Sequence, residues 1–194
     1  MAVFLNLFTK KTWDEFKQNG SSVSGFPKTR LGWAKKVKVG DYLVCYIGDE
    51  GFSRLVGMLE VASECYEDHT TIIWRKEIYP IRFKVKILVE LKEEQYIPIK
   101  SILDELECYQ TLKNKNRWSI IVRGSLLCFS EKDAIFLIKT LTGASSGKRT
   151  PATPSAPRKQ LIKNQILSLN ELKDVISGET FKKIQEQLAR EYIS

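Results

Sequence analysis

Five apolar segments rich in Val, Ile, Leu, Phe and Tyr constrain the fold of this chain more than any other feature of its sequence. They are DYLVCYI, SRLVGMLEVASE, TTIIWR, IRFKVKILVEL and SIIVRGSLLCF, which begin at Asp41, Ser53, Thr70, Ile81 and Ser119. β-Branched and aromatic residues favour strands, and partial alternation with polar residues indicates strands that bury one face. The N-terminal AVFLNLF adds another buried strand. We therefore expect a sheet at the centre of the fold.

A few short helices separate these strands. The first is predicted to start with Thr12 as N-cap and Glu15 completing a capping box, and to end near Asn19 and Gly20. IPIKSILDEL and SEKDAIFLIKTL also show helical patterns, and Ser130 caps the second of them. Many strands with few helices predict an α+β fold, built as a curved, mostly antiparallel barrel with short flanking helices.

The composition changes after residue 142. We predict a main domain over residues 1–142, a basic linker rich in Gly, Ser, Thr and Pro over 143–160, and a short amphipathic helical segment over 161–194. The linker either is a solvated tether or rests on phosphates. The terminal segment is too short to fold alone, so it docks on the main domain, self-associates or recruits a protein effector.

Charge and residue content exclude several classes of function. The formal charge of +8 favours a polyanionic partner. The four cysteines are widely spaced and His69 is the only histidine, so we expect no zinc site, no disulfide framework and no cofactor. No apolar run approaches the roughly 20 residues that span a bilayer, and MAVFLNLFTKK makes a poor signal peptide. We expect a cytoplasmic protein without a membrane partner.

Longer motifs resemble a known family. GWAKKVKVGDYLVCYIGDEGFSRLVGMLEVASECYED, IIWRKEIYPIRFKV, and NKNRWS followed by EKDAIFLIKTL are similar to the EVE domain, a PUA-like domain related to YTH and ASCH domains. The resemblance covers roughly Phe4 to Leu141. It implies a compact barrel with a pocket for a modified nucleobase of DNA or RNA. EVE domains also occur beside nucleases and McrB-type modules, which implies a role in restriction or defence.

The resemblance also implies which residues line that pocket. Flipping a base out of a duplex costs a few kcal/mol, and aromatic stacking returns about 1–3 kcal/mol per base. In many relatives a Trp stands where this chain has Ser24, so the stacking face is expected from Phe26 or Trp74. The predicted pocket residues are Ser24, Gly25, Phe26, Tyr46, Trp74, Tyr79 and Arg82.

Each aromatic or charged candidate also has a structural interpretation. Trp74 lies in an apolar segment and is either a pocket wall or a core residue. Tyr46 places its hydroxyl in the pocket or fills the barrel. Arg82 either forms a buried ion pair or contacts an anion. Trp33 is expected to cap the barrel, and Trp118 to anchor the last strand.

Basic residues that follow the Gly-Phe-Pro turn at Gly25 are natural phosphate contacts. They are Lys28, Arg30, Lys35, Lys36 and Lys38. The ASCH likeness also suggests an enzyme with Lys28, Thr29 and Glu60 as reacting groups, but the spacing of these residues does not support catalysis. The sequence therefore predicts a nucleic-acid-binding reader without catalytic residues. Modified duplex DNA is the first candidate ligand and RNA the second, and a scaffold that recruits an effector is a further alternative.

Overall fold

The computed structural model of the protein describes residues 1–49, 51–70, 74 and 78–147. The chain divides into two compact units, residues 1–147 and 148–194, and only the first contains described residues. The predicted terminal helical segment, the linker beyond residue 147 and most of the predicted strand TTIIWR therefore lie outside the described residues.

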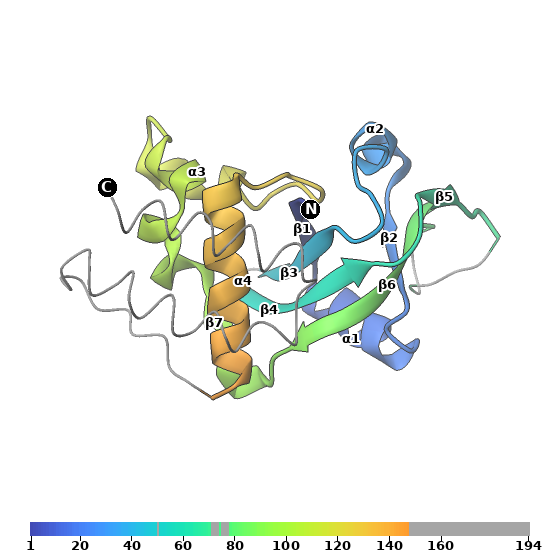
Figure 1. The fold of residues 1–194 in the computed structure, drawn as a ribbon, viewed down its shortest axis with the longest axis horizontal. Coiled ribbons are helices and arrows are strands. Elements are labelled where there is room, and N and C mark those ends of the chain that lie inside the picture. Colours follow the sequence, from blue (N-terminus) through green and yellow to red (C-terminus); the bar gives the residue numbers. More distant parts are fainter. Residues whose placement is uncertain (50, 71–73, 75–77, 148–194) are drawn as a thin grey trace. The chain divides into compact units, whose positions relative to one another are not determined.

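A curled, mixed sheet is the centre of the first unit (Figure 1). Its principal strands follow the order β1-β3-β4-β6-β2, with β5 added beside β6 and β7 beside β4. β1 and β3 run parallel, and the other pairs are antiparallel. Within the described residues the strands are β1 (Val3–Phe8), β2 (Val23–Phe26), β3 (Tyr42–Asp49), β4 (Phe52–Val61), β5 (Tyr66–Glu67), β6 (Ile81–Glu90) and β7 (Ile97–Pro98).

Two irregularities in the central strands increase the curl of the sheet. The β3–β4 register shifts between Cys45 and Tyr46, and the β4–β6 register shifts between Met58 and Leu59. Such bulges bend a strand and increase its twist. Beside the second shift, a Cβ atom at Gly57 would lie 2.4 Å from the carbonyl oxygen of Val89, so only glycine fits there.

The two edge strands of this sheet meet through a side-chain hydrogen bond. β1 and β2 stand at opposite ends of the strand order. Even so, the amide Nδ2 of Asn6 in β1 donates to Oγ of Ser24 in β2 at 2.8 Å, and both side chains are buried. The sheet thus curls into a half-barrel whose edges are joined by side chains.

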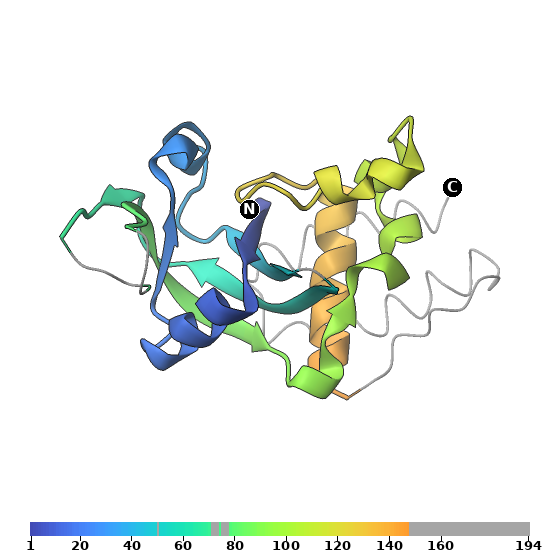
Figure 2. The same ribbon diagram turned by 180° about the vertical axis from the view of Figure 1, so that it is seen from behind.

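Helices cover the sheet at several points. The α-helices among the described residues are α1 (Lys10–Gln18), α2 (Leu31–Ala34), α3 (Glu107–Gln110) and α4 (Glu131–Ser145). The 3₁₀ turns are η1 (Lys28–Arg30), η2 (Glu93–Gln95), η3 (Ile99–Ser101), η4 (Leu103–Glu105) and η5 (Lys115–Ile120). Helix α1 packs against β1 and β3, whereas α4 packs against β4 and β6, as views from opposite sides show (Figures 1 and 2).

These elements confirm the predicted α+β, PUA-like fold with a curved sheet and short flanking helices, and show that the predicted barrel is a half-barrel. The strands β1, β3, β4 and β6 lie where their apolar segments predicted them. Helix α4 begins after Ser130, whose Oγ accepts a hydrogen bond from the backbone N–H of Asp133 at 3.2 Å. Helix α1 ends at Asn19, followed by Gly20 at φ +80°, as expected. None of the described helices is long and apolar enough to cross a membrane.

Three local predictions about helix boundaries were wrong. Helix α1 begins one turn earlier than predicted, because the side chains of Thr9 and Thr12 form a reciprocal capping box with each other's backbone N–H groups. IPIKSILDEL forms β7, η3 and η4 instead of one helix: Ile97 and Pro98 pair with β4, and Ile102 at φ −124° separates the two 3₁₀ turns. Helix α4 extends through Ser145, into the first residues of the predicted linker.

Two segments around the later site also differ from the prediction. Ser24, Gly25 and Phe26 form strand β2 and not a turn, because they pair with β6. SIIVRGSLLCF does not form a strand: its first residues belong to η5, and its tail bonds to β1 irregularly, with an isolated β-bridge between Phe4 and Cys128. Trp118, expected to anchor a last strand, therefore lies in η5.

Candidate nucleic-acid interface

An irregular segment, residues 125–129, covers the free edge of β1. The N–H of Leu5 donates to the carbonyl of Leu127 at 2.9 Å, and the N–H of Leu126 donates to the carbonyl of Leu5 at 2.6 Å. The N–H of Leu7 donates to Oγ of Ser125 at 3.1 Å. These bonds satisfy an edge that would otherwise present unpaired backbone groups.

Leu126 holds this segment in an unusual conformation. Its φ is +65°, the left-handed region, and its side chain is fully buried. A non-glycine residue there stores strain that the surrounding contacts must offset, and such residues cluster at binding and active sites. The neighbours Ser125 and Leu127 are directed by this turn toward a hollow in the surface.

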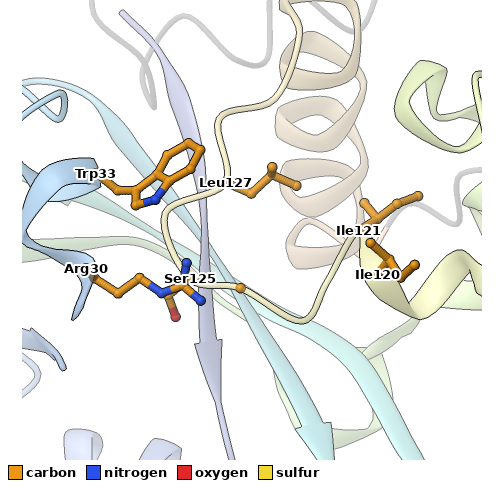
Figure 3. A pocket seen from close by; sticks show the side chains of 7 residues that line it. Arg30, Trp33, Ile120, Ile121, Ser125 and Leu127 are labelled. Atoms are coloured by element: carbon orange, nitrogen blue, oxygen red, sulfur yellow. The ribbon is translucent and has the colours of Figure 1, made fainter.

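That hollow, called the Arg30 pocket below, has a volume of about 80 Å³. Arg30 and Trp33 form one wall, and the segment that ends η5 and covers β1 forms the other (Figure 3). The residues of the second wall are Ile120, Ile121, Gly124, Ser125 and Leu127.

Gly124 allows the two walls to approach closely. A Cβ atom at this position would lie 3.1 Å from Nη2 of Arg30 and 3.5 Å from Nη1. The guanidinium therefore rests beside bare backbone, next to the hydroxyl of Ser125 (Figure 3). Arg30 forms no ion pair with any described residue, so its charge is available to an anion.

The rim of the Arg30 pocket combines exposed apolar surface with positive charge. Trp33 and Ile120 are 43% and 49% exposed, values that are unusual for such large apolar side chains. The ammonium of Lys36 lies 4.8 Å from the centroid of the Trp33 ring. A flat aromatic face beside cations is a suitable surface for a stacked base and its phosphates.

Two stretches of the chain without acidic residues supply this charge. Residues 27–40, from the end of β2 through α2, carry five Lys or Arg residues, and residues 108–130 carry four. Each stretch contributes one wall of the Arg30 pocket. Because no carboxylate within either stretch opposes these cations, they form the kind of basic surface that attracts a polyanion.

The predicted phosphate contacts lie on the first of these stretches. Lys28 and Arg30 belong to η1, and Lys35 and Lys36 follow α2. Lys28, Lys35 and Lys36 are exposed, whereas Arg30 is half-buried in the pocket wall. Of these four residues, Arg30 lines the pocket and Lys36 contacts Trp33 at its rim, and contact of all four with phosphate stays a prediction.

The predicted nucleobase residues of β2 are buried in the sheet and away from this pocket wall. Ser24 is bonded to Asn6, Gly25 pairs with Arg82, and the Phe26 ring packs edge-on against Phe83 at 5.9 Å. The side chains of Ser24 and Phe26 are at most 1% exposed. In this conformation they support the closure of the half-barrel and present no open face.

Trp74 and Tyr79 belong to an aromatic cluster within the core. Their ring centroids are 4.5 Å apart and edge-to-face, and Trp74 also contacts Phe8 at 5.9 Å. Phe8 in turn packs on Trp13 and Phe16 of α1. Trp74 is only 6% exposed, so the core interpretation describes its position in this structure.

Arg82 and Tyr46 also have partners inside the protein. The guanidinium of Arg82 donates to Oδ2 of Asp68 at 2.6 Å and to the carbonyl of Tyr79 at 3.0 Å, which is the buried ion pair that the sequence left open. Burial raises the pKa of Tyr46, and a side-chain hydrogen bond with Ser53 opposes that rise. Tyr46 is buried, so its side chain lies within the sheet.

Sequence reasoning missed most of the Arg30 pocket. It named Arg30 as a phosphate contact and Trp33 as a barrel cap, and it placed residues 119–129 in a strand. The sequence feature that could have indicated this pocket is the pair of stretches without acidic residues, each of which has a large apolar residue near its centre. No group of three or more potential metal ligands occurs among the described residues, so we find no metal centre in that part of the chain.

Comparisons with known proteins agree with this fold. The family model of the EVE domain matches residues 4–123. The UPF0310 protein PYRAB08750 of Pyrococcus abyssi is 30% identical over 152 residues, which cover 73% of this chain and 99% of that protein.

Two solved structures with low sequence identity share the architecture. The YTH domain of Zygosaccharomyces rouxii MRB1 in complex with N6-methyladenosine RNA aligns with a TM-score of 0.53 and 16% identity, covering 72% of this chain and 86% of that one. Human THYN1 in complex with DNA containing 5-methylcytosine aligns with a TM-score of 0.50 and 11% identity, covering 78% and 100%. With its EVE model match over most of the first unit, this chain belongs to the EVE domain family.

Proposed function

We propose that this protein binds nucleic acid and holds a modified base, flipped out of a DNA duplex, against Trp33 and Arg30. The observation that carries the proposal is the Arg30 pocket itself, where an exposed tryptophan and an arginine without an ion pair to a described residue lie between two acid-free basic stretches. Trp33 offers a stacking face, and Arg30 offers donors for a base edge or a phosphate.

The size of the pocket sets a condition on this binding. Pockets that enclose small organic ligands usually have volumes of about 300–1,000 Å³, and the Arg30 pocket has about 80 Å³. A base therefore enters only if the Trp33 side chain rotates outward. The exposure of Trp33, at 43%, leaves it free to do so. Its present contact with Lys36 is an exposed cation–π pair worth about 0.5–1 kcal/mol.

The buried residues named from the family resemblance keep a supporting role in this proposal. Ser24 and Asn6 fix the two edge strands, and Leu5 and Leu7 of β1 hold the second pocket wall through backbone bonds. Positions that support a site must be rigid if the site is to discriminate by a single methyl group.

Relatives of this fold support nucleic acid as the ligand. The two solved structures named above are in complex with N6-methyladenosine RNA and with DNA containing 5-methylcytosine. We place DNA first and RNA second. A role as the recognition part of a restriction or defence system, with residues 161–194 recruiting a protein effector, extends the proposal. Pull-downs with and without that segment test it, and recovery of the same partners by both forms would count against it.

The decisive experiment measures binding by fluorescence anisotropy at fixed salt, because phosphate contacts alone give affinity that ignores sequence. One duplex carries adenine, 6-methyladenine, cytosine, 5-methylcytosine or 5-hydroxymethylcytosine at a single position, with matched RNA alongside. We expect one modified duplex to bind at least about tenfold tighter, a difference of ~1.4 kcal/mol. Equal binding of all duplexes, with RNA bound more tightly, would favour the RNA alternative.

Three variants locate the site. Trp33→Ala is expected to abolish the preference for the modified base, and Arg30→Ala to weaken binding of every duplex as well. Lys92→Ala removes one exposed positive charge at the end of β6, where it lines no part of the Arg30 pocket, and serves as the matched control. If Lys92→Ala weakens binding as much as Arg30→Ala does, only net charge matters and the pocket is not the site.

A further inference from the structure

A second hollow is lined by earlier residues of η5 than the Arg30 pocket is. It has a volume of about 320 Å³ and is called the Tyr109 pocket below. It is formed by the short helical turns that Figure 1 shows in green to yellow beside α4. The lining residues are Lys100, Leu103, Asp104, Tyr109, Lys115, Asn116 and Trp118.

Two aromatic rings in the Tyr109 pocket each have a lysine beside them. The ammonium of Lys100 lies 5.7 Å from the Trp118 ring centroid, and that of Lys115 lies 4.5 Å from the Tyr109 ring centroid. Lys115 is fixed further, because it donates to the carbonyls of Tyr109 and Gln110 at 2.6 and 2.8 Å. Lys100 is exposed and has no such bonds to described residues, so it is the lysine that can move.

Polar groups at the same hollow have capacity to recognise a base edge. The side chains of Asn116 and Asp104 are exposed, and neither makes a hydrogen bond to another described residue. An asparagine amide pairs with the donor and acceptor of adenine, and a carboxylate accepts from exocyclic amino groups. The negative charge of Asp104 repels a phosphate, whereas the lysines of the same pocket attract one.

The Tyr109 pocket is joined to the Arg30 pocket by η5. Asn116 and Trp118 line the former and Ile120 lines the latter, all within one six-residue turn. The whole connection belongs to the acid-free stretch 108–130. A nucleic-acid strand that runs from the Arg30 pocket to the Tyr109 pocket along this stretch passes basic residues and no acidic residue of the stretch.

We infer that the Tyr109 pocket binds an unpaired nucleotide of the nucleic acid that this protein binds. The base stacks on Trp118, Lys100 leaves the ring to contact the phosphate, and Asn116 and Asp104 contact the base edge. The exchange is favourable because base–aromatic stacking is stronger than an exposed cation–π contact. This inference rests on the proposed function only in taking nucleic acid as the ligand.

The test compares a blunt duplex with the same duplex carrying a short single-stranded extension at its 3′ or its 5′ end, by fluorescence anisotropy at fixed salt. Each is prepared with and without the modified base. We expect one extension to tighten binding about tenfold, ~1.4 kcal/mol, and Trp118→Ala to remove this gain while the ratio of modified to unmodified binding is kept.

Asn116→Ala provides a second variant at an exposed position, where folding is not at risk, and is expected to reduce the gain and make it insensitive to the extension's base. Lys92→Ala is again the charge control. Equal affinity for blunt and extended duplexes in the unaltered protein overturns the inference, as does a gain that survives in both pocket variants. If the unaltered protein shows no preference for the modified base but still binds the extended duplex more tightly, and this gain depends on Trp118, the proposed function is refuted and the inference stands.

Discussion

Asp133 joins the first turns of two helices, and its replacement by asparagine measures how much stability that junction provides. Its carboxylate is fully buried and accepts hydrogen bonds from the backbone N–H groups of Glu107 at 2.6 Å and Cys108 at 3.0 Å. These donors start α3, which carries Tyr109. The same carboxylate lies in the first turn of α4, where negative charge is favourable.

The expected loss follows from these contacts. Asparagine keeps one acceptor oxygen but turns an NH₂ group toward the second backbone donor, so one charge-assisted bond worth about 1.5–3 kcal/mol is lost. Loss of the charge from the first turn of α4 adds about 0.3–1 kcal/mol. We therefore expect Asp133→Asn to destabilise the protein by about 2–4 kcal/mol, which lowers Tm by roughly 5–15 °C for a chain of this size.

Urea and thermal unfolding followed by circular dichroism measure this loss. Glu131→Gln is the matched control, because Glu131 stands in the same first turn but is exposed. It should cost no more than about 1 kcal/mol. If both variants lose the same small amount, the buried hydrogen bonds of Asp133 contribute nothing and the reasoning fails.

The thiol of Cys108 gives an independent measurement of the same change. Burial, which contributes most, together with the charge and the hydrogen bond of Asp133 raises its pKa to about 12. Asp133→Asn removes the contribution of the charge, so the Cys108 pKa should fall, although burial keeps it above the ordinary value. Alkylation rates between pH 8 and about 10, followed by mass spectrometry of each cysteine peptide, detect the shift. An unchanged rate at Cys108 would contradict the assignment.

Other predictions concern the two tryptophans, the pocket glycine and the strand closure. Trp74→Ala should cost about 3–5 kcal/mol of unfolding free energy because its ring is 6% exposed, whereas Trp33→Ala, at 43% exposure, should cost at most about 0.5 kcal/mol; similar losses in urea unfolding would refute this contrast. Gly124→Ala places a methyl group 3.1 Å from the Arg30 guanidinium. Since that group is the end of a flexible side chain, the free energy of unfolding should change by less than about 0.5 kcal/mol, while duplex affinity falls a few-fold. Unchanged affinity in anisotropy would show that the position of the Arg30 guanidinium does not matter for binding. Asn6→Ala leaves a buried hydroxyl without its donor and should cost about 1–3 kcal/mol, with faster amide exchange in β1 and β2; protection equal to the unaltered protein would show that the edges close without it.

The central strands could be predicted because their sequence and their environment agree. β4 and β6 are each ten residues long and rich in β-branched and large apolar residues, so local preference and tertiary pairing favour the same conformation. Residues 119–129 have equally strong strand preference, yet they fold as a turn and an irregular segment. There the close approach of Gly124 to Arg30 and the left-handed backbone of Leu126 override local preference.

The site was only partly predictable for a different reason. Charge is visible in sequence, so the cations of η1 and α2 were identified. Which face an aromatic side chain presents is decided by pairings between distant segments. The sequence around Trp74 and Trp33 does not show which of the two is buried. In the structure Trp74 packs against Tyr79 and Phe8, whereas Trp33 lies on a four-residue helix at the surface. Only the tertiary structure separates these two roles.

The Arg30 pocket arises from the way this sheet covers its first edge. β1 and β2 stand at opposite ends of the strand order, and the side chains of Asn6 and Ser24 join them through a hydrogen bond. The backbone N–H and C=O groups along the outer edge of β1 therefore need partners from another segment. Residues 125–129 supply these partners through an irregular backbone that bonds β1 without extending the sheet toward η1 and α2. The space left between this cover and Arg30 is the hollow. A regular strand in its place would pair more completely and would carry alternating side chains along that edge, whereas the irregular cover turns at Leu126 with a left-handed φ of +65°.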